Sequence, residues 1–151
     1  MDAKAYIALF AGAVALAAFL TTFFEYRRQG AAKRADRFIE MRQRLRGNAE
    51  FVQICALLES DDQQLREVPL LVKDNFVGFF EELTLLWNSK VFNDQVVFYM
   101  FGYFAIKCWR SKNFWADLNR EQQLWGHFRD MVSRLEDLQK SFKVDRRQYR
   151  V

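Results

Sequence analysis

The side chains that most often perform catalysis are few and scattered in this sequence. His127 is the single histidine, and the two cysteines, Cys55 and Cys108, lie far from it and from each other along the chain. Zinc sites usually take Cys or His pairs at short spacing, and neither Cys-x-x-Cys nor His-x-x-x-His occurs here. We therefore expect no metal site, and we interpret His127 as a packed or surface histidine.

Two adjacent carboxylates, Glu81 and Glu82, could in principle act as a general acid and base. Adjacent residues of a helix diverge by about 100°, so these two side chains cannot face one site. Glu82 lies nearer the apolar face, and we expect it to pair with Lys107 or Arg110 as a structural device. A Gly-rich phosphate loop and a Gly-x-Ser-x-Gly motif are also missing. The sequence thus favours a protein that is not an enzyme and carries no cofactor.

The elements that would position any site are helices. Residues 94–110 place apolar side chains in nearly every direction around a helix, which is typical of a buried helix or of one in lipid. Their uncharged part, residues 96–106, is shorter than the about 20 residues that cross a bilayer. We interpret this stretch as the central helix of a small bundle, whose expected core includes Phe76, Phe80, Phe101, Phe104, Trp109 and Trp125.

A second apolar stretch, residues 5–24, is free of charge and has the length of a bilayer span, roughly 30 Å at about 1.5 Å per residue. A buried helix of a soluble protein is one alternative, and a cleaved signal peptide is another. A signal peptide ends in a small-x-small cleavage site, whereas this run ends in bulky and charged residues, Phe23-Phe24-Glu25-Tyr26-Arg27-Arg28. The sequence therefore favours an uncleaved signal anchor.

The distribution of basic residues predicts the orientation of this anchor. Only Lys4 precedes the run, whereas many Lys and Arg residues follow it, and these mark the cytoplasmic side. We expect the N-terminus outside and the C-terminal domain in the cytoplasm, at a bacterial inner membrane. The residues expected at the lipid headgroups are Arg27, Arg28, Lys33, Arg34 and Arg37. Nucleic-acid binding is not expected, because this basic stretch lacks aromatic platforms.

Small residues line one face of the predicted span. Ala8, Gly12 and Ala15 follow one another at spacings of a helical turn. Such residues let two helices approach closely in lipid, so they predict packing on a second copy or on another membrane protein subunit. The other interpretation is that alanine is simply tolerated in a span.

Turn and capping residues divide the rest of the chain. Asn48 is placed to cap a helix with apolar residues at helical spacing, and Ser60 to cap a short turn. Pro69 suits the first position of the next helix, and Asn93 caps the helix of residues 94–110. After a break at residues 111–113, we expect one long helix reaching Phe142.

These observations predict an all-α protein with one N-terminal transmembrane helix that continues into a small cytoplasmic helical bundle. The expected parts are a signal anchor at 1–26, a basic juxtamembrane helix at 27–47, a bundle at 48–142 and a basic tail at 143–151. Cys55 and Cys108 lie in apolar helical contexts, so we expect buried free thiols in a reducing compartment.

The order of segments also carries a resemblance. After the span come Arg34-Ala-Asp-Arg-Phe-Ile-Glu, then Asn75-Phe-Val-Gly-Phe-Phe-Glu-Glu-Leu, then Val91-Phe-Asn-Asp-Gln-Val-Val-Phe-Tyr-Met-Phe-Gly-Tyr-Phe, and finally Phe114-Trp115 and Trp125. This pattern resembles a family of small bacterial single-pass membrane proteins with a cytoplasmic helical domain of unknown function. The resemblance implies the same topology and bundle, and it implies no catalytic residues.

Three classes of function are compatible with these features. The leading one is a membrane-anchored interaction protein, a subunit or an assembly or scaffold factor of a membrane complex. The alternative is an effector or regulator that perturbs the membrane in bacterial stress or phage defence. An enzyme with an unrecognised site is the third.

Overall fold

The computed structural model describes residues 3–141, apart from the side chains of 3–9, 11, 13 and 141, and this part contains helices and turns but no strand. The prediction of an all-α fold is confirmed. Within the described residues, no helix combines the length and the apolar character needed to cross a membrane. The expected basic tail at 143–151 lies outside the described residues.

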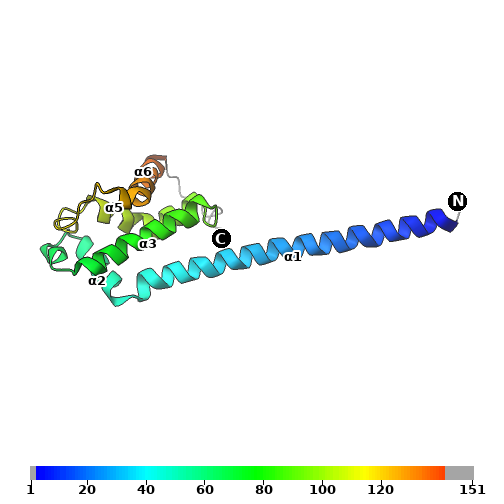
Figure 1. The fold of residues 1–151 in the computed structure, drawn as a ribbon, viewed down its shortest axis with the longest axis horizontal. Helices are drawn as coiled ribbons and strands as arrows, with labels where there is room; N and C mark the ends of the chain where they lie inside the picture. Colours follow the sequence, from blue (N-terminus) through cyan, green and yellow to red (C-terminus); the bar gives the residue numbers. More distant parts are fainter. Residues whose placement is uncertain (1–2, 142–151) are drawn as a thin grey trace. The chain divides into compact units, whose positions relative to one another are not determined.

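Helices of very different length follow one another along the chain (Figure 1). In order they are α1 (Ala3–Gly47), α2 (Ala49–Leu58), the 3₁₀-helix η1 (Gln63–Arg66), α3 (Leu70–Asn88), α4 (Asp94–Val97), the π-helix η2 (Phe98–Gly102), α5 (Tyr103–Arg110), the 3₁₀-helix η3 (Gln123–Trp125) and α6 (Gly126–Ser141). They fall into two compact units, unit 1 (Met1–Asp36) and unit 2 (Arg37–Val151).

The end of α1 belongs to unit 2. Met41 and Leu45 are buried in its hydrophobic core, and the ring of Phe38 packs edge-on against Phe92 and Phe101, at centroid distances of 6.3 and 6.4 Å. The sequence assigned residues 27–47 to a basic juxtamembrane part of the helix, outside the bundle. The structure instead places 37–47 in the bundle, because an apolar stripe faces the core on this last part of α1.

The unit boundary yields a prediction for truncated chains. A fragment of residues 37–151 should unfold cooperatively, whereas a fragment of residues 48–151 should be less stable by about 3–6 kcal/mol. The reason is that the shorter fragment lacks Met41 and Leu45, and burying each such side chain contributes about 1.5–3 kcal/mol. Urea unfolding followed by tryptophan fluorescence measures the difference. Equal midpoints and slopes would contradict the placement of residues 37–47.

Helix α3 is the centre of unit 2. Its buried residues are Val72, Lys73, Phe76, Val77, Phe79, Phe80, Leu83, Thr84 and Trp87, which point to several sides of the helix. The expectation that residues 94–110 form an all-round buried helix is wrong, because Tyr99 and Tyr103 are 64% and 52% exposed. Of the expected core residues, Phe76, Phe80, Phe101 and Trp125 are buried, whereas Phe104 and Trp109 are only half-buried.

The stretch of residues 94–110 is helical throughout, but it changes pitch in the middle. The π-helix η2 separates α4 from α5 and ends at Gly102. A Cβ atom at Gly102 would lie 3.2 Å from Leu135 Cδ2, which is tighter than an ordinary van der Waals contact, and 3.4 Å from Phe98 Cδ2. The missing side chain therefore lets this helix approach α6 closely.

The same substitution, glycine to alanine, made at two positions tests this close approach. Gly78→Ala, in the middle of α3, should stabilise unit 2 by about 0.5–1 kcal/mol, because alanine favours a helix and nothing lies within 4 Å of the new methyl group. Gly102→Ala should give no such gain, because the methyl group meets the buried Leu135. Thermal unfolding of both variants measures the contrast, and an equal rise in Tm would contradict it.

Two of the four predictions for helix starts hold, and two do not. Asn48 Oδ1 accepts hydrogen bonds from the backbone of Glu50 (2.9 Å) and Phe51 (3.2 Å), and Asn93 Oδ1 accepts one from Val96 N (2.8 Å). The cap of η1 is Asp62 rather than Ser60. Pro69 precedes α3 as its N-cap residue instead of starting it.

The expected long C-terminal helix is wrong over its first part. Residues 111–122 form turns, and α6 begins only at Gly126. Contacts with other elements hold this segment in its turns: Trp115 Nε1 donates to Cys108 O (2.8 Å), and Arg120 Nη1 donates to Trp109 O (3.0 Å). These tertiary hydrogen bonds outweigh the helical spacing of the apolar residues in this segment.

Candidate functional site

The side chains with catalytic potential do not converge. His127 is exposed, and the described residues hold no group of three or more His, Cys, Asp or Glu that could bind a metal ion. Cys55 and Cys108 are buried free thiols, as expected. Burial raises the pKa of Cys55 to about 12 and that of Cys108 well above its ordinary value. Both cysteines are therefore neutral thiols at neutral pH and poor nucleophiles.

The two adjacent glutamates serve structural purposes in different places. Glu82 forms an ion pair with Arg44 of α1, and this hydrogen bond raises the pKa of Arg44. The expected pairing of Glu82 with Lys107 or Arg110 is wrong, because those cations bind other carboxylates. Glu81 Oε1 accepts a hydrogen bond from the backbone of Phe128 at the start of α6 (2.7 Å). The two carboxylates thus point to different elements, as the helical geometry predicted.

Among the described residues, the ammonium group of Lys73 is buried without a hydrogen bond. The Lys73 side chain is fully buried, and its Nζ has no hydrogen-bond partner within the described structure. The nearest carboxylate oxygen, Asp117 Oδ2, lies 3.8 Å away, and the Phe114 ring centroid lies 5.9 Å away. Burial lowers the pKa of Lys73, and the charge of Asp117 opposes that effect only in part. We interpret this buried ammonium group as a cost in stability.

Lys73→Met should therefore stabilise unit 2 by about 1–4 kcal/mol at pH 7, because an apolar side chain of similar length replaces a buried charge. The gain should shrink as the pH rises toward 10.5. In that range the folded state, with the lower pKa, loses the Lys73 proton before the unfolded state does, so the wild type gains stability. Urea unfolding at pH 7 and pH 10 measures both effects, and a destabilised variant would contradict them.

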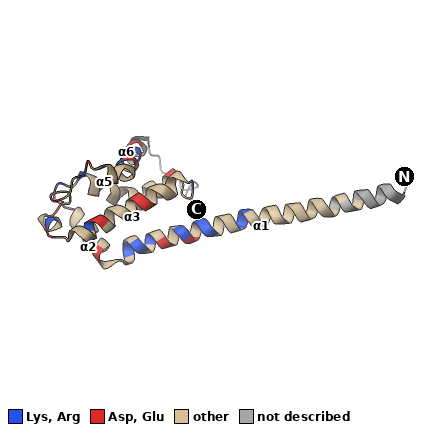
Figure 2. Cartoon of the chain, viewed as in Figure 1, with Lys and Arg blue, Asp and Glu red and all other residues tan. Residues whose placement is uncertain are grey.

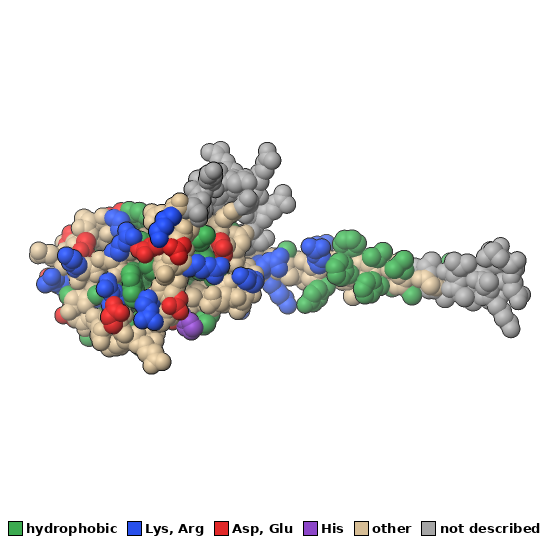
Figure 3. Space-filling view, turned by 90° about the horizontal axis from the view of Figure 1, so that it is seen from above, with side chains coloured by type: hydrophobic (Ala, Val, Ile, Leu, Met, Phe, Trp, Pro, Cys, Tyr) green, Lys and Arg blue, Asp and Glu red, His purple; other side chains and the backbone are tan. Residues whose placement is uncertain are grey.

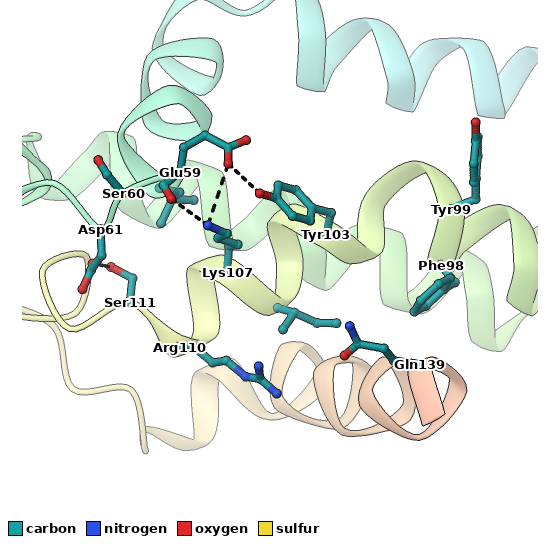
Figure 4. A pocket seen from close by; sticks show the side chains of 12 residues that line it. Glu59, Ser60, Asp61, Phe98, Tyr99, Tyr103, Lys107, Arg110, Ser111 and Gln139 are labelled. Atoms are coloured by element: carbon teal, nitrogen blue, oxygen red, sulfur yellow. Dashed lines mark hydrogen bonds and ion pairs between the residues drawn. The ribbon is translucent and has the colours of Figure 1, made fainter. Parts of the chain in front are cut away.

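Unit 2 has a groove of about 560 Å³, which we call the tyrosine groove (Figure 4). Its lining comes from the end of α2 and the turn after it, from η2 and α5, and from α6. Leu58, Phe98 and Ile106 provide apolar walls, and Tyr99 and Tyr103 provide exposed aromatic rings. The groove thus joins an apolar surface to a polar margin.

The polar margin is organised around Glu59. Tyr103 donates its hydroxyl hydrogen to Glu59 Oε2 (2.5 Å), and Lys107 Nζ donates to the Glu59 backbone carbonyl (2.7 Å). Lys107 Nζ also lies 3.8 Å from Glu59 Oε2 and 5.4 Å from the centroid of the Tyr103 ring. The three side chains meet between α2 and α5, as Figure 4 shows. They hold α5 against the C-terminal end of α2.

Asp61 ties the neighbouring turn to the segment after α5. Its carboxylate accepts hydrogen bonds from Ser111 Oγ and from the backbone of Lys112 and Asn113, both at 3.3 Å. Asn113 Nδ2 also donates to the Asp61 carbonyl (2.5 Å). Asp61 adopts a positive φ of 51°, a conformation that aspartate tolerates better than most residues. The Asp61 carboxylate is consequently engaged in holding the fold.

The far side of the groove is formed by α6. Arg110 reaches Glu136 of that helix with both Nε and Nη2, at 3.0 and 2.7 Å from the same oxygen. Gln139, one turn further along α6, lines the groove opposite Phe98 (Figure 4). The groove therefore has α5 on one side and α6 on the other.

Sequence reasoning missed this groove. Its residues come from three separated segments, and their convergence depends on how α2, α5 and α6 pack. One signal was present: Tyr99 and Tyr103 stand one turn apart in an otherwise apolar helix, and tyrosine at such positions is typical of a surface that is partly wet.

The residues expected to contact the membrane lie in α1. The Ala8 side chain is outside the described residues, and Ala15 is exposed. No atom lies within 4 Å of a Cβ placed at Gly12. Of the expected headgroup residues, Arg27, Arg28, Lys33 and Arg37 are exposed and Arg34 is half-buried. Arg37 belongs to unit 2, where it forms an ion pair with Glu40 (2.7 Å).

Comparison with known proteins identifies no relative. No protein-family model matches the chain, and neither a curated protein nor a solved structure matches it. The resemblance to small bacterial single-pass membrane proteins thus stays a prediction from sequence.

Proposed function

We propose that this protein is a membrane-anchored, non-enzymatic interaction protein, a subunit or an assembly or scaffold factor of a membrane complex in the bacterial inner membrane. One observation carries the proposal: α1 presents large apolar side chains to its surroundings. Phe10, Leu16, Phe19 and Phe24 are 73%, 60%, 65% and 64% exposed. Large exposed apolar surfaces mark sites of contact with membranes or proteins.

The polar side chains of this stretch are compatible with lipid. Thr21 Oγ1 donates back to the carbonyl of Ala18 (2.8 Å), and Thr22 Oγ1 also donates to Ala18 (2.9 Å). A hydroxyl group inside a bilayer has to satisfy its hydrogen bonds within the protein. The proposed span, residues 5–24, includes side chains outside the described residues, and the proposal rests on the sequence there.

The change from apolar to basic residues supports the orientation. On α1 an uncharged stretch is followed by many Lys and Arg residues (Figure 2). Hydrophobic side chains gather along the described part of unit 1, with basic side chains next to them (Figure 3). By the positive-inside rule, unit 2 lies in the cytoplasm, and Arg27, Arg28 and Lys33 contact the headgroups of anionic lipids.

The acidic side chains of unit 2 support a non-enzymatic role, because they hold the fold together. Glu59, Asp61, Glu81 and Glu82 all take part in hydrogen bonds between separate elements, so each has a structural role. In the span, the small residues Ala8, Gly12 and Ala15 provide a face for a second helix, from another copy or from another subunit.

Gly12→Leu tests this face. In lipid no hydrophobic force drives helices together, so close packing at small residues has to supply the attraction. The substitution should reduce association of the full-length chain with itself or with a partner span, whereas Leu16→Ile should not. Cysteine crosslinking at Ala15 in native membranes, followed by mass spectrometry of mild-detergent eluates, measures both kinds of contact.

A measurement of membrane topology serves as the control for Gly12→Leu and Leu16→Ile. Alkaline phosphatase fused after Val151 should be inactive in the wild type and in both variants, because the fusion point lies in the cytoplasm. An active fusion in the wild type would overturn the proposed orientation. Unchanged crosslinking and co-purification in the Gly12 variant would show that residues 5–24 are not the contact surface.

A further inference from the structure

We propose that residues 116–124, which we call the Asp117 loop, form a lid that opens locally over Lys73, and that the buried charge of Lys73 favours the open state. This device goes beyond the anchoring and packing role proposed for α1. The loop and the side chains that it contacts belong to unit 2, so the device does not depend on the proposed span.

The Asp117 loop lies between two packed tryptophans. Trp115 and Trp125 are buried, and their ring centroids are 6.4 Å apart, so the side chains at the two ends of the loop meet. Between them no residue is buried: Leu118 and Arg120 are half-buried, and the other residues of the loop are exposed. Compact surface loops with converging ends are often functional. The loop can therefore move while its two ends stay packed.

Few contacts in the described structure attach the loop to other elements. Arg120 Nη1 donates to Trp109 O (3.0 Å), and its guanidinium carbon lies 5.0 Å from the Trp109 ring centroid. Asp117 Oδ2 lies 3.8 Å from Lys73 Nζ, and Leu118 packs partly against the core. The backbone donors of the loop bind acceptors only two or three positions earlier in the chain. A segment with so few tertiary contacts opens at a lower free energy than the whole unit.

The ammonium group of Lys73 opposes the closed state of the loop. The Lys73 side chain has no exposed surface, and its Nζ makes no hydrogen bond in the described structure. A charge that is removed from water without such a bond destabilises the state in which it is buried. Asp117, which lies against this group, is itself 58% exposed, so the ammonium group is one side chain away from solvent. Displacement of the loop would therefore bring water to Lys73 Nζ.

A second buried donor at the same loop gives independent support. Trp125 Nε1, directly after the loop, is buried and has no hydrogen-bond acceptor in the described structure. A buried donor without an acceptor keeps the unfavourable free energy of its lost hydration. Lys73 Nζ and Trp125 Nε1 are the buried side-chain donors of the described residues that lack an acceptor, and both adjoin the Asp117 loop. The groups that oppose closure are thus gathered where the fewest contacts maintain it.

Acetylation of Lys73 measures the opening, because the closed loop shields its amine from a reagent. The full-length chain in mild detergent is treated with N-hydroxysuccinimidyl acetate to low conversion. Mass spectrometry of its peptides then gives the rates at Lys73 and at the exposed Lys90. We expect Lys73 to react more slowly than Lys90, at a rate that stays constant over low urea concentrations. A local opening exposes little new surface, so urea hardly changes its population.

Two variants of the loop test its contact with Lys73. Asp117→Asn should raise the acetylation rate of Lys73 about threefold or more, because it removes the carboxylate that attracts the ammonium group to the closed loop. Glu121→Gln removes the same charge from the same loop, but Glu121 pairs with Arg120 (3.4 Å) and should leave the rate unchanged.

Lys73→Met tests the role of the charge with a different measurement. Hydrogen exchange of peptides that cover residues 116–125 should slow about tenfold or more, because methionine has no ammonium group that gains hydration when the loop opens. Lys90→Met, at an exposed lysine, should leave this exchange as in the wild type.

Three outcomes would overturn the proposal. If Lys73 never reacts, or if its rate rises with urea as steeply as global unfolding does, the loop does not open locally. Equal acetylation rates in the Asp117 and Glu121 variants would show that Asp117 does not hold the loop closed. If Lys73→Met slows exchange in α3 and leaves residues 116–125 unchanged, the buried charge opposes the whole fold and not the closed loop.

Discussion

The complete burial of the aromatic residues on α3 is the constraint on which unit 2 depends. Phe76, Phe79 and Phe80 are fully buried, and their rings pack on one another, with centroid distances of 5.3 Å from Phe76 to Phe80 and 5.1 Å from Phe79 to Phe80. Rings from several other segments cover this cluster. The covering rings are Phe51 of α2 on Phe76 (5.2 Å), Phe101 of η2 on Phe79 (6.0 Å), Phe114 on Phe76 (6.0 Å) and Phe128 of α6 on Phe80 (5.1 Å).

This arrangement explains why short helices are enough to cover the aromatic side chains of α3. Each covering element contributes one or two rings, and a buried aromatic pair adds about 0.5–1.5 kcal/mol beyond the burial of its area. The C-terminal end of α3 is closed by a polar cluster. Trp87 Nε1 donates to Asp94 Oδ1 (3.0 Å), Arg134 forms an ion pair with Asp94, and the guanidinium carbon lies 3.8 Å from the Trp87 ring centroid. One tryptophan thus joins α3, α4 and α6.

The parts of the fold that the sequence predicted are those set by local interactions. The caps Asn48 and Asn93 bind backbone N–H groups two or three residues ahead, so their role can be recognised from the neighbouring residues alone. The partner of Glu82 could not be recognised in this way, because Arg44 lies on another helix, 38 residues earlier in the chain. The turns of residues 111–122 were not predicted for a related reason: the Asp61 carboxylate that holds their start lies about 50 residues earlier in the chain, and the carbonyls of Cys108 and Trp109 that hold Trp115 and Arg120 are reached only when the chain folds back on α5.

The groove could not be predicted from the sequence, because it is formed by side chains that stay exposed after the core has packed. The face of η2 and α5 that carries Phe101, Ala105 and Cys108 is buried, whereas Tyr99 and Tyr103 on the other side are exposed. Tyrosine can occupy such a face at low cost, since its ring covers apolar neighbours while its hydroxyl stays polar. α2 and α6 then stand on either side of this face, tied to α5 through Glu59 and Glu136. The groove lies along this exposed face, so it is a consequence of how the bundle closes.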